Sequence, residues 1–266
     1  MNDPHVEELI YHIETGDGLR FQDPPPVEDE TDTFDMILED GVATFSMKEH
    51  HLTEESARRT VEGYLRDWEL DVALLYDSSE LHFIFDRSKI VDRDPPPPPG
   101  TPRVVELSAT ATGTSSTSAT LQVLKTKYPQ PPRDFSADTD ARAMWEQYER
   151  YKEGRDRLLP MAYSCLARLE HRARNHGANG KRKNAASMYR IDHKVLDKLG
   201  KLTNTLGDEV EARKLTQQSQ LRAPTPQEAK WMESALRLVI RRTGQYAADP
   251  QKEWPQLTMA DLPELA

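Results

Sequence analysis

The stretch FDMILEDGVATFSM, residues 34–47, holds two runs of alternating apolar residues on either side of Asp40-Gly41. The apolar positions are Phe34, Met36 and Leu38 before the turn and Ala43, Phe45 and Met47 after it. An Asp-Gly pair between two such runs is typical of a tight β-hairpin, because both turn residues must adopt positive φ. The stretch therefore predicts two antiparallel strands with one apolar face.

A helix is predicted directly after this hairpin. Thr53 precedes Glu54 and Glu55 in the way that an N-cap precedes an acidic first turn. Apolar residues then recur at helical spacing, at Ala57, Val61, Tyr64, Leu65, Trp68 and Val72. Further strand-like runs occupy residues 9–13, 81–85, 89–91, 104–107 and 121–124. We therefore expect an antiparallel sheet with one packed helix over residues 1–127.

The composition changes after two low-complexity stretches. Five consecutive prolines, 95–99, favour a polyproline spacer, and residues 109–120 are rich in Ser and Thr. The segment 128–136 begins Tyr-Pro-Gln-Pro-Pro and predicts a proline-rich linker. Residues 137–266 then read as an all-helical domain, so the fold class expected for the whole chain is α+β.

Two features organise this helical half. An apolar stripe runs from Trp145 to Leu169 and is interrupted by Gly154 and Pro160, where a kink or a new helix is expected. The run Thr225-Pro226-Gln227-Glu228 forms a capping box that begins the last helix. We expect three arginines to lie at the C-terminal end of that helix and to complement its dipole: Arg237, Arg241 and Arg242.

Composition excludes several classes of protein. The single cysteine, Cys165, excludes a disulfide framework and multi-cysteine metal sites, and it favours a reducing, cytoplasmic location. It also lies on the apolar stripe, which predicts a buried thiol. No apolar run approaches the roughly 20 residues of a spanning helix, and the acidic start is unlike a signal peptide, so we expect neither membrane insertion nor export. No complete catalytic, metal-binding or cofactor-binding signature is present, so we expect no cofactor.

Charge divides the chain into two opposite halves. Residues 1–100 hold 8 Lys+Arg against 25 Asp+Glu, a net charge of −17, whereas residues 101–266 hold 27 against 20, a net charge of +7. This split suits an acidic half that docks on or inhibits a basic half, or a basic half that binds an anionic partner.

The densest positive charge lies between Arg168 and Arg190, which includes seven Lys or Arg and the single acid Glu170. Clustered cations of this kind can neutralise nucleic-acid phosphates, although helix C-termini also favour cations for structural reasons. Within the run, GANG at 177–180 matches the GxxG loop of KH domains, but a plain turn between helices explains it better because the flanking pattern of that family is absent.

The segment AASMYRIDHKVL, residues 185–196, resembles a helix-turn-helix motif. The resemblance implies that Asp192 caps the second helix and that Ala186, Ile191 and Leu196 hold the two helices together. Arg190 departs from the pattern, because the family usually has a left-handed glycine at that position. The nucleic-acid-binding residues expected from the basic run and this motif are Arg172, Arg174, Lys181, Arg182, Lys183, Arg190, His193, Lys194 and Lys198.

The helical half also resembles the HEPN bundles, many of which are ribonucleases of prokaryotic toxin and defence systems. Those enzymes use an Arg-x4–6-His motif, whereas here His176 follows Arg172 by four positions and Arg168 by eight. The resemblance therefore implies a degenerate, noncatalytic bundle. The layout as a whole also resembles bacterial families that end in an arginine-tipped helix and a short tail.

Together these features predict a noncatalytic cytoplasmic prokaryotic protein that binds DNA or RNA, as an accessory of a defence or mobile-element system. A HEPN-like ribonuclease is an alternative, and it requires Arg172 or Arg174 near His176 or His193 across a homodimer cleft. A protein-interaction scaffold is another, with a protein partner at an apolar patch of the tail formed by Trp254, Pro255, Leu257, Met259 and Leu262. Against this patch, the tail is expected to fold back on its own domain, because Thr258 can cap a short closing helix.

Overall fold

The computed structural model describes residues 2–16, 19–76, 81–94, 105–108, 123–175, 177, 180–206 and 222–265. They form two compact units, Met1–Pro132 and Arg133–Ala266. The division falls inside the segment 128–136 that the sequence predicts as a linker. Both ends of that segment are packed, because Tyr128 is buried in the first unit and Phe135 in the second.

The N-terminal unit is built on an antiparallel sheet with the strand order β3-β4-β5-β1-β6-β7. Its strands are β1 (Pro4–Thr15), β3 (Val27–Glu30), β4 (Phe34–Glu39), β5 (Val42–Met47), β6 (Leu81–Asp92) and β7 (Val105–Ser108). A separate parallel pair joins β2 (Leu19–Phe21) to β8 (Val123–Lys125). The proline run 95–99 and the Ser/Thr-rich stretch 109–120 lie outside the described residues.

The predicted hairpin is confirmed. Strands β4 and β5 pair in register from Phe34–Met47 to Glu39–Val42. Asp40 and Gly41 connect them with φ values of 50° and 77°, as a type I′ turn requires. The backbone N–H of Gly41 donates to the hydroxyl of Tyr128 at 2.7 Å. The first residue of the predicted linker is therefore hydrogen-bonded to this turn.

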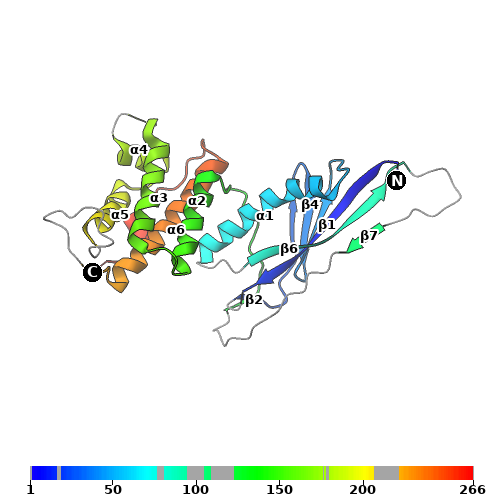
Figure 1. Cartoon of the computed structure of the whole chain (residues 1–266), viewed down its shortest axis with the longest axis horizontal. Helices are drawn as coiled ribbons and strands as arrows, with labels where there is room; N and C mark the ends of the chain where they lie inside the picture. The colour runs from blue at the N-terminus through cyan, green and yellow to red at the C-terminus, as the bar shows by residue number, and fades with distance from the viewer. Residues whose placement is uncertain are drawn as a thin grey trace. The chain divides into compact units, whose positions relative to one another are not determined.

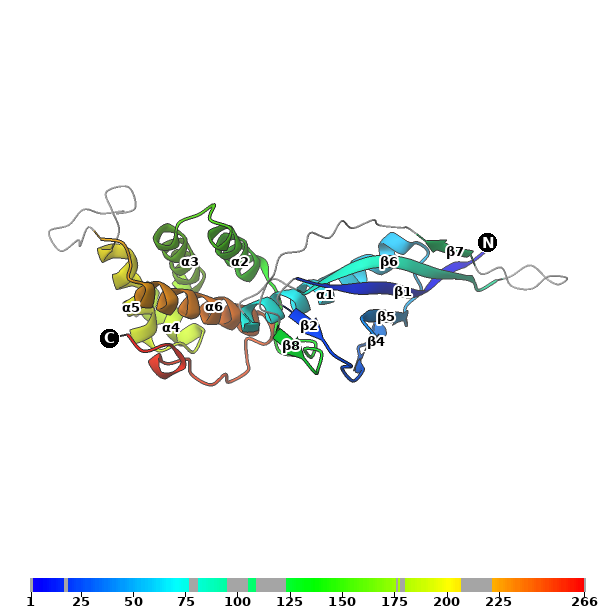
Figure 2. The ribbon, with the colours of Figure 1, turned by 90° about the horizontal axis from the view of Figure 1, so that it is seen from below.

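One helix, α1 (Glu54–Tyr76), packs on the sheet and contacts β1 and β6 (Figures 1 and 2). Its buried residues are Ala57, Val61, Leu65, Trp68, Leu70, Asp71, Val72, Ala73 and Leu74, and the apolar side of the hairpin joins them in one core. Aromatic rings connect the two layers, because Tyr64 of α1 lies 5.2 Å from Phe34 in an edge-to-face arrangement. The predicted α+β fold, with one helix on an N-terminal antiparallel sheet, is confirmed.

Two strands differ in length from the sequence prediction. Residues 9–13 form only the middle of the twelve-residue strand β1, and residues 81–85 and 89–91 belong to one continuous strand, β6. Strands β1 and β6 pair along almost their whole length, with register shifts at Val6/Glu8 and Ile10/Tyr11. These irregularities break the period-two pattern, so the sequence shows short fragments where the structure has long strands.

The C-terminal unit is helical, as predicted. It contains α2 (Thr139–Lys152), α3 (Leu158–Arg172), α4 (Lys181–Met188), α5 (His193–Thr205) and α6 (Pro226–Ala248), with short 3₁₀ turns η1 (Ala173–Asn175) and η2 (Met259–Asp261). The apolar stripe is divided at Gly154, which has a φ of 72°, and Pro160 lies in the first turn of the new helix. Helix α3 contacts α2, α4, α5 and α6, so it is the central element of the unit.

The capping box at Thr225 and Glu228 is confirmed, but the predicted position of the arginines is wrong. Helix α6 continues to Ala248, and its last turn contains no basic residue. Arg242 instead lies in the helix interior and is only 8% exposed. The arginines end at residue 242, but the helix continues to Ala248 because Arg242, Thr243 and Gly244 are still packed against the core.

None of the helices in the described part of the chain combines the length and apolarity needed to cross a membrane.

Gly244 permits a close approach between α6 and the start of the helical unit. A Cβ atom at this position would lie 2.2 Å from Cε2 of the buried Phe135 ring, and the backbone N–H of Ser136 donates to the Gly244 carbonyl at 3.1 Å. Gly63, in the exposed face of α1, has no such neighbour.

We predict that Gly244→Ala lowers the free energy of unfolding by about 1–3 kcal/mol, because the new methyl group overpacks against Phe135. The matched variant Gly63→Ala should raise it by about 0.5–1 kcal/mol, because alanine favours the helix where space is available. Chemical denaturation measures both. Equal effects of the two substitutions would contradict the proposed role of Gly244.

Three histidines gather where β1 meets the start of α1. Nδ1 of the buried His5 accepts from the backbone N–H of His51 at 3.4 Å, so this ring is neutral there. Its Nε2 is buried and has no hydrogen-bond partner among the described residues. Burial, with the positive charges of Arg93 and His50, lowers the pKa of His5.

This pKa shift predicts a loss of stability in acid. The unfolded chain binds a proton at His5 near its ordinary pKa of about 6.5, whereas the folded chain resists protonation, so the free energy of unfolding falls as pH drops below that value. Denaturation at a series of pH values should show a shallower acid loss for His5→Gln, which cannot be protonated. An unchanged slope in that variant would show that other groups cause the acid loss.

Candidate nucleic-acid-binding surface

Helices α4 and α5 are joined by a turn of four residues, 189–192. Asp192 caps α5, because its Oδ1 accepts from the backbone N–H of Lys194 at 2.9 Å. Arg190 adopts the left-handed conformation with a φ of 53°. The backbone thus turns where the helix-turn-helix resemblance expects a left-handed residue, although that residue is an arginine rather than glycine.

The residues expected to hold the two helices together are buried. Ala186 is 8% exposed, Ile191 1% and Leu196 0%. The backbone N–H of Ile191 also donates to the carbonyl of Ala186 at 2.9 Å, which closes the turn. The pair is therefore a packed unit and not merely two consecutive helices.

The C-terminal tail stabilises this turn from outside the helix pair. Leu257 forms an isolated parallel bridge with Ile191, through its N–H to the Arg190 carbonyl at 2.9 Å and its carbonyl to the Asp192 N–H at 2.7 Å. Trp254, Leu257 and Leu262 are each at most 7% exposed. Three of the five residues suggested as a scaffold patch are therefore packed against their own unit.

Arg242 joins the tail to the turn. Its Nη1 donates to the carbonyls of Tyr189 at 3.2 Å, Arg190 at 3.2 Å and Pro255 at 2.9 Å. Burial, with the nearby charge of Arg241, lowers the pKa of Arg242. An arginine remains charged despite such a shift, so its role here is structural.

A second arginine connects α3, α4 and α5. Nε of Arg182 donates to Glu170 at 2.7 Å, and its Nη1 donates to Asp197 at 3.2 Å. Burial alone would lower the pKa of Arg182, but the hydrogen bonds to both carboxylates raise it. The guanidinium lies against α5 at Gly200, where a Cβ atom would come within 2.7 Å of it.

Three of the nine residues expected to bind nucleic acid thus have carboxylate partners within the protein. Arg182 binds Glu170 and Asp197, His193 lies 3.3 Å from Asp197, and Arg172 lies 3.5 Å from Asp140. Arg190 also donates from Nε to the Trp254 carbonyl at 3.4 Å. The other five, Arg174, Lys181, Lys183, Lys194 and Lys198, have no ion-pair partner among the described residues.

The outward face of α5 carries three lysines at helical spacing: Lys194, Lys198 and Lys201. The opposite face is buried through Val195, Leu196, Leu199, Leu202 and Thr203. Lys201, like the other two, has no ion-pair partner in the described part of the chain. Sequence reasoning missed Lys201, although the same i, i+4, i+7 pattern that predicts the helix would have included it. We call these three residues the α5 lysine stripe.

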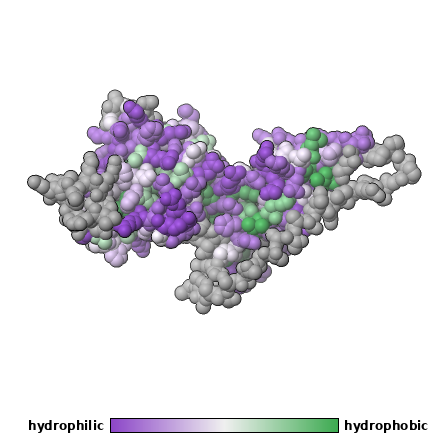
Figure 3. Space-filling view, viewed as in Figure 1, coloured by the Kyte–Doolittle hydropathy of each residue, from purple (hydrophilic) through white to green (hydrophobic). Residues whose placement is uncertain are grey.

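The first turn of α4 carries further cations. Lys181 and Lys183 are exposed and flank Arg182, whose side chain reaches the middle of α5. Helix N-termini carry partial positive charge, so unpaired lysines there reinforce a positive surface. In the space-filling view, hydrophilic side chains cover most of the visible face of the helical unit (Figure 3).

The described residues offer neither a metal site nor a reactive cysteine. They contain no group of three or more His, Cys, Asp or Glu side chains placed to hold a metal ion. Cys165 is buried, and burial raises its pKa to about 12, so it is a core residue and not a thiolate nucleophile. His176 and two residues of the GANG turn, 178 and 179, lie outside the described part.

The N-terminal unit has an open pocket of about 390 Å³, beside the β4–β5 turn. Its lining combines the aromatic pair Phe21 and Tyr128, 4.8 Å apart, with Arg20, Asp23 and Asp40. These groups could bind a small polar molecule, but no nucleophile lies beside a base among the described lining residues.

Comparison with known proteins finds no matching family model, no matching curated protein and no matching solved structure.

The left-handed turn can be tested through Arg190. We predict that Arg190→Gly raises the free energy of unfolding by about 0.5–1 kcal/mol, because glycine adopts positive φ without the steric cost of a Cβ atom. Arg190→Val should lower it by about 1–3 kcal/mol, because a β-branched residue tolerates this conformation least. Denaturant unfolding provides the measurement.

Ser187→Gly is the matched control, because Ser187 is an exposed residue within α4. It should lower the free energy of unfolding by at most about 0.5 kcal/mol, since Ser187 is the last but one residue of α4 and glycine disfavours the helical conformation. If Arg190→Gly is as destabilising as this control, the left-handed turn is not the conformation in solution.

Proposed function

We propose that the helical unit binds nucleic acid through the α5 lysine stripe, with duplex DNA as the preferred form. In this proposal the protein is a noncatalytic cytoplasmic accessory of a prokaryotic defence or mobile-element system. The observation that carries the binding proposal is the presence of three unpaired lysines on the exposed side of a helix whose other side is packed.

Unpaired charge distinguishes the stripe from the cations of the unit that bind carboxylates, such as Arg172 and Arg182. A lysine that already binds a carboxylate gains less from a phosphate, because the carboxylate loses its partner when the phosphate binds. Lys194, Lys198 and Lys201 have no such competitor among the described residues. Each can therefore neutralise a phosphate and release a counterion.

The helix pair supports a duplex as the ligand. In helix-turn-helix proteins the second helix enters the major groove and the first crosses the backbone. Here Lys194 is the second residue of α5, close to the end that reaches base edges in those proteins, and Lys181 and Lys183 lie in the first turn of α4. The narrow major groove of duplex RNA does not admit a helix in this way, which favours DNA.

The contacts of Arg172 favour a structural role over a catalytic one for this residue, whereas Arg174, the other arginine of the ribonuclease alternative, has no ion-pair partner among the described residues. A HEPN-like ribonuclease needs an arginine free to act on the RNA phosphate, but Nη1 of Arg172 lies 3.5 Å from the carboxylate of Asp140. Arg168 lies 3.3 Å from the same residue. These pairs give both arginines a role at the contact between α2 and α3.

The test is fluorescence anisotropy with a short labelled duplex DNA and a single-stranded RNA of equal length, over a series of salt concentrations. Changing Lys194, Lys198 and Lys201 together to Gln should weaken duplex binding at least about tenfold at low salt. It should also make the slope of log affinity against log salt shallower by about 3. Thermal unfolding would verify that the variant remains folded.

The control variant combines Arg59→Gln, Arg66→Gln and Lys230→Gln, which removes the same charge from exposed positions on α1 and α6. It should bind as the unchanged protein does. An equal loss in the control would reveal non-specific attraction, and an absence of binding at low salt would refute the proposal. RNA cleavage that disappears with Arg172→Ala would favour the ribonuclease instead.

A further inference from the structure

The sheet of the N-terminal unit has two very different faces. The residues that point toward α1 form the core, and the alternate residues of the same strands lie on the opposite side, which we call the open face. On that side Ile37 is 47% exposed and Ile84 is 37% exposed. Large aliphatic side chains that are exposed on a sheet face are typical of an interaction surface when they belong to one patch.

Strand register aligns the apolar residues of the open face. Ile37 of β4 lies opposite Thr44 of β5, which in turn lies opposite Ile10 of β1. In the next row, His12 of β1 lies between Val42 and Ile84. Four aliphatic side chains, Ile10, Ile37, Val42 and Ile84, thus lie on four neighbouring strands, with Thr44 and His12 between them, and Nε2 of His12 lies 3.2 Å from Asp86. We call these aliphatic residues the apolar centre.

Carboxylates surround this apolar centre. They belong to the same outward positions of the strands, or to the bulge of β6, and are Glu8, Glu14, Glu28, Glu30, Asp35, Glu39 and Asp86. Among the side chains that the structure describes on this face, three full cations accompany them: Lys48, Arg87 and Lys89. The open face thus keeps an excess of negative charge, in agreement with the net charge of −17 over residues 1–100.

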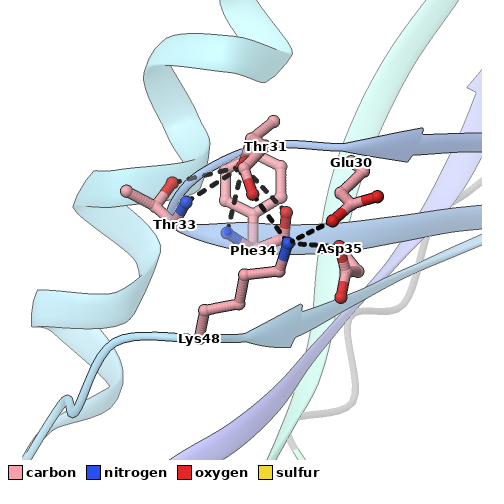
Figure 4. Close-up of polar contacts among 6 residues, drawn as sticks. All are labelled: Glu30, Thr31, Thr33, Phe34, Asp35 and Lys48. Atoms are coloured by element: carbon pink, nitrogen blue, oxygen red, sulfur yellow. Dashed lines mark hydrogen bonds and ion pairs between the residues drawn. The ribbon is translucent and has the colours of Figure 1, made fainter.

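The cations are already bound by carboxylates. Lys48 donates to Glu30 at 3.2 Å and lies 2.8 Å from Asp35, as Figure 4 shows. Its pKa is raised, first because of the hydrogen bond to Asp35. Arg87 lies 2.9 Å from Asp86, and Lys89 lies 2.7 Å from Glu7 and 3.3 Å from Glu8. Glu14, Glu28 and Glu39 have no ion-pair partner among the described residues.

The charge pattern of the open face indicates which kind of molecule can bind there. A second copy docked face to face would bring two acidic rims together, and nucleic acid would be repelled in the same way. Strand addition at the β3 edge is also opposed, because β3 has the sequence VEDE and carries three acids. We propose that the open face binds a basic protein surface in which lysines or arginines surround aliphatic side chains.

The defined probe for this proposal is a labelled amphipathic peptide with leucines on one helical face and lysines on the other. Binding should shift the amide NMR signals of Ile10, Ile37, Thr44 and Ile84. The pair Ile37→Thr and Ile84→Thr, which keeps β-branched residues in the strands, should weaken binding about tenfold. The pair Glu28→Gln and Glu39→Gln should weaken it and reduce its salt dependence.

Matched controls change the same residue types elsewhere. Leu52→Thr with Leu75→Thr removes exposed apolar side chains outside the open face, and Glu55→Gln with Glu253→Gln removes exposed acids there. Both control pairs should bind the peptide unchanged. Signal shifts confined to other surfaces, or equal losses in the controls, would overturn the proposal.

Two further experiments distinguish this proposal from the nucleic-acid-binding proposal and from dimerisation through the open face. The variant with Lys194, Lys198 and Lys201 changed to Gln should bind the peptide normally, because the two surfaces belong to different units. Sedimentation should give the same mass for the unchanged protein and for the Ile37→Thr, Ile84→Thr variant. If the unchanged protein is a dimer that this variant dissociates, the occupant is a second copy and the proposal is wrong.

Discussion

The buried guanidinium of Arg242 connects three segments of the helical unit that are distant in the sequence. It belongs to α6, and it donates to the turn between α4 and α5 and to the tail at Pro255. A buried carbonyl without a partner costs about 1–3 kcal/mol, so this side chain helps to hold the turn and the tail together, beside the backbone hydrogen bonds that join Leu257 to Arg190 and Asp192. The geometry of α5, and with it the orientation of its lysines, depends on that turn.

Carboxylates decide which cations of the helical unit remain free. Glu170 and Asp197 bind Arg182, and Asp140 binds both Arg168 and Arg172. These contacts lie between helices and stabilise their packing. The lysines on the outer side of α5 form no ion pair among the described residues, so they leave unpaired positive charge where this helix faces solvent.

The N-terminal unit shows the opposite arrangement. Its helix covers one face of the sheet, and the other face keeps an aliphatic centre surrounded by acids. One protein thus offers a basic helical surface and an acidic sheet surface, in separate units. A nucleic acid and a basic protein could bind to the two surfaces without competing for the same residues, because their charges direct them to different units.

The sequence by itself determined the hairpin at Asp40-Gly41, the helix α1, the capping box at Thr225, the cap at Thr258, and the α+β class, because each depends on neighbouring residues along the chain. It also identified Asp192 as a cap and Ile191 and Leu196 as buried residues. The sequence did not predict which distant residues contact one another. The length of β1 and β6, the burial of Arg242 and the pairing of Arg182 with Glu170 and Asp197 arise from contacts between distant segments. Only the tertiary structure could therefore separate cations that hold helices together from cations that face solvent, because the charge of a residue is local but its partners are not.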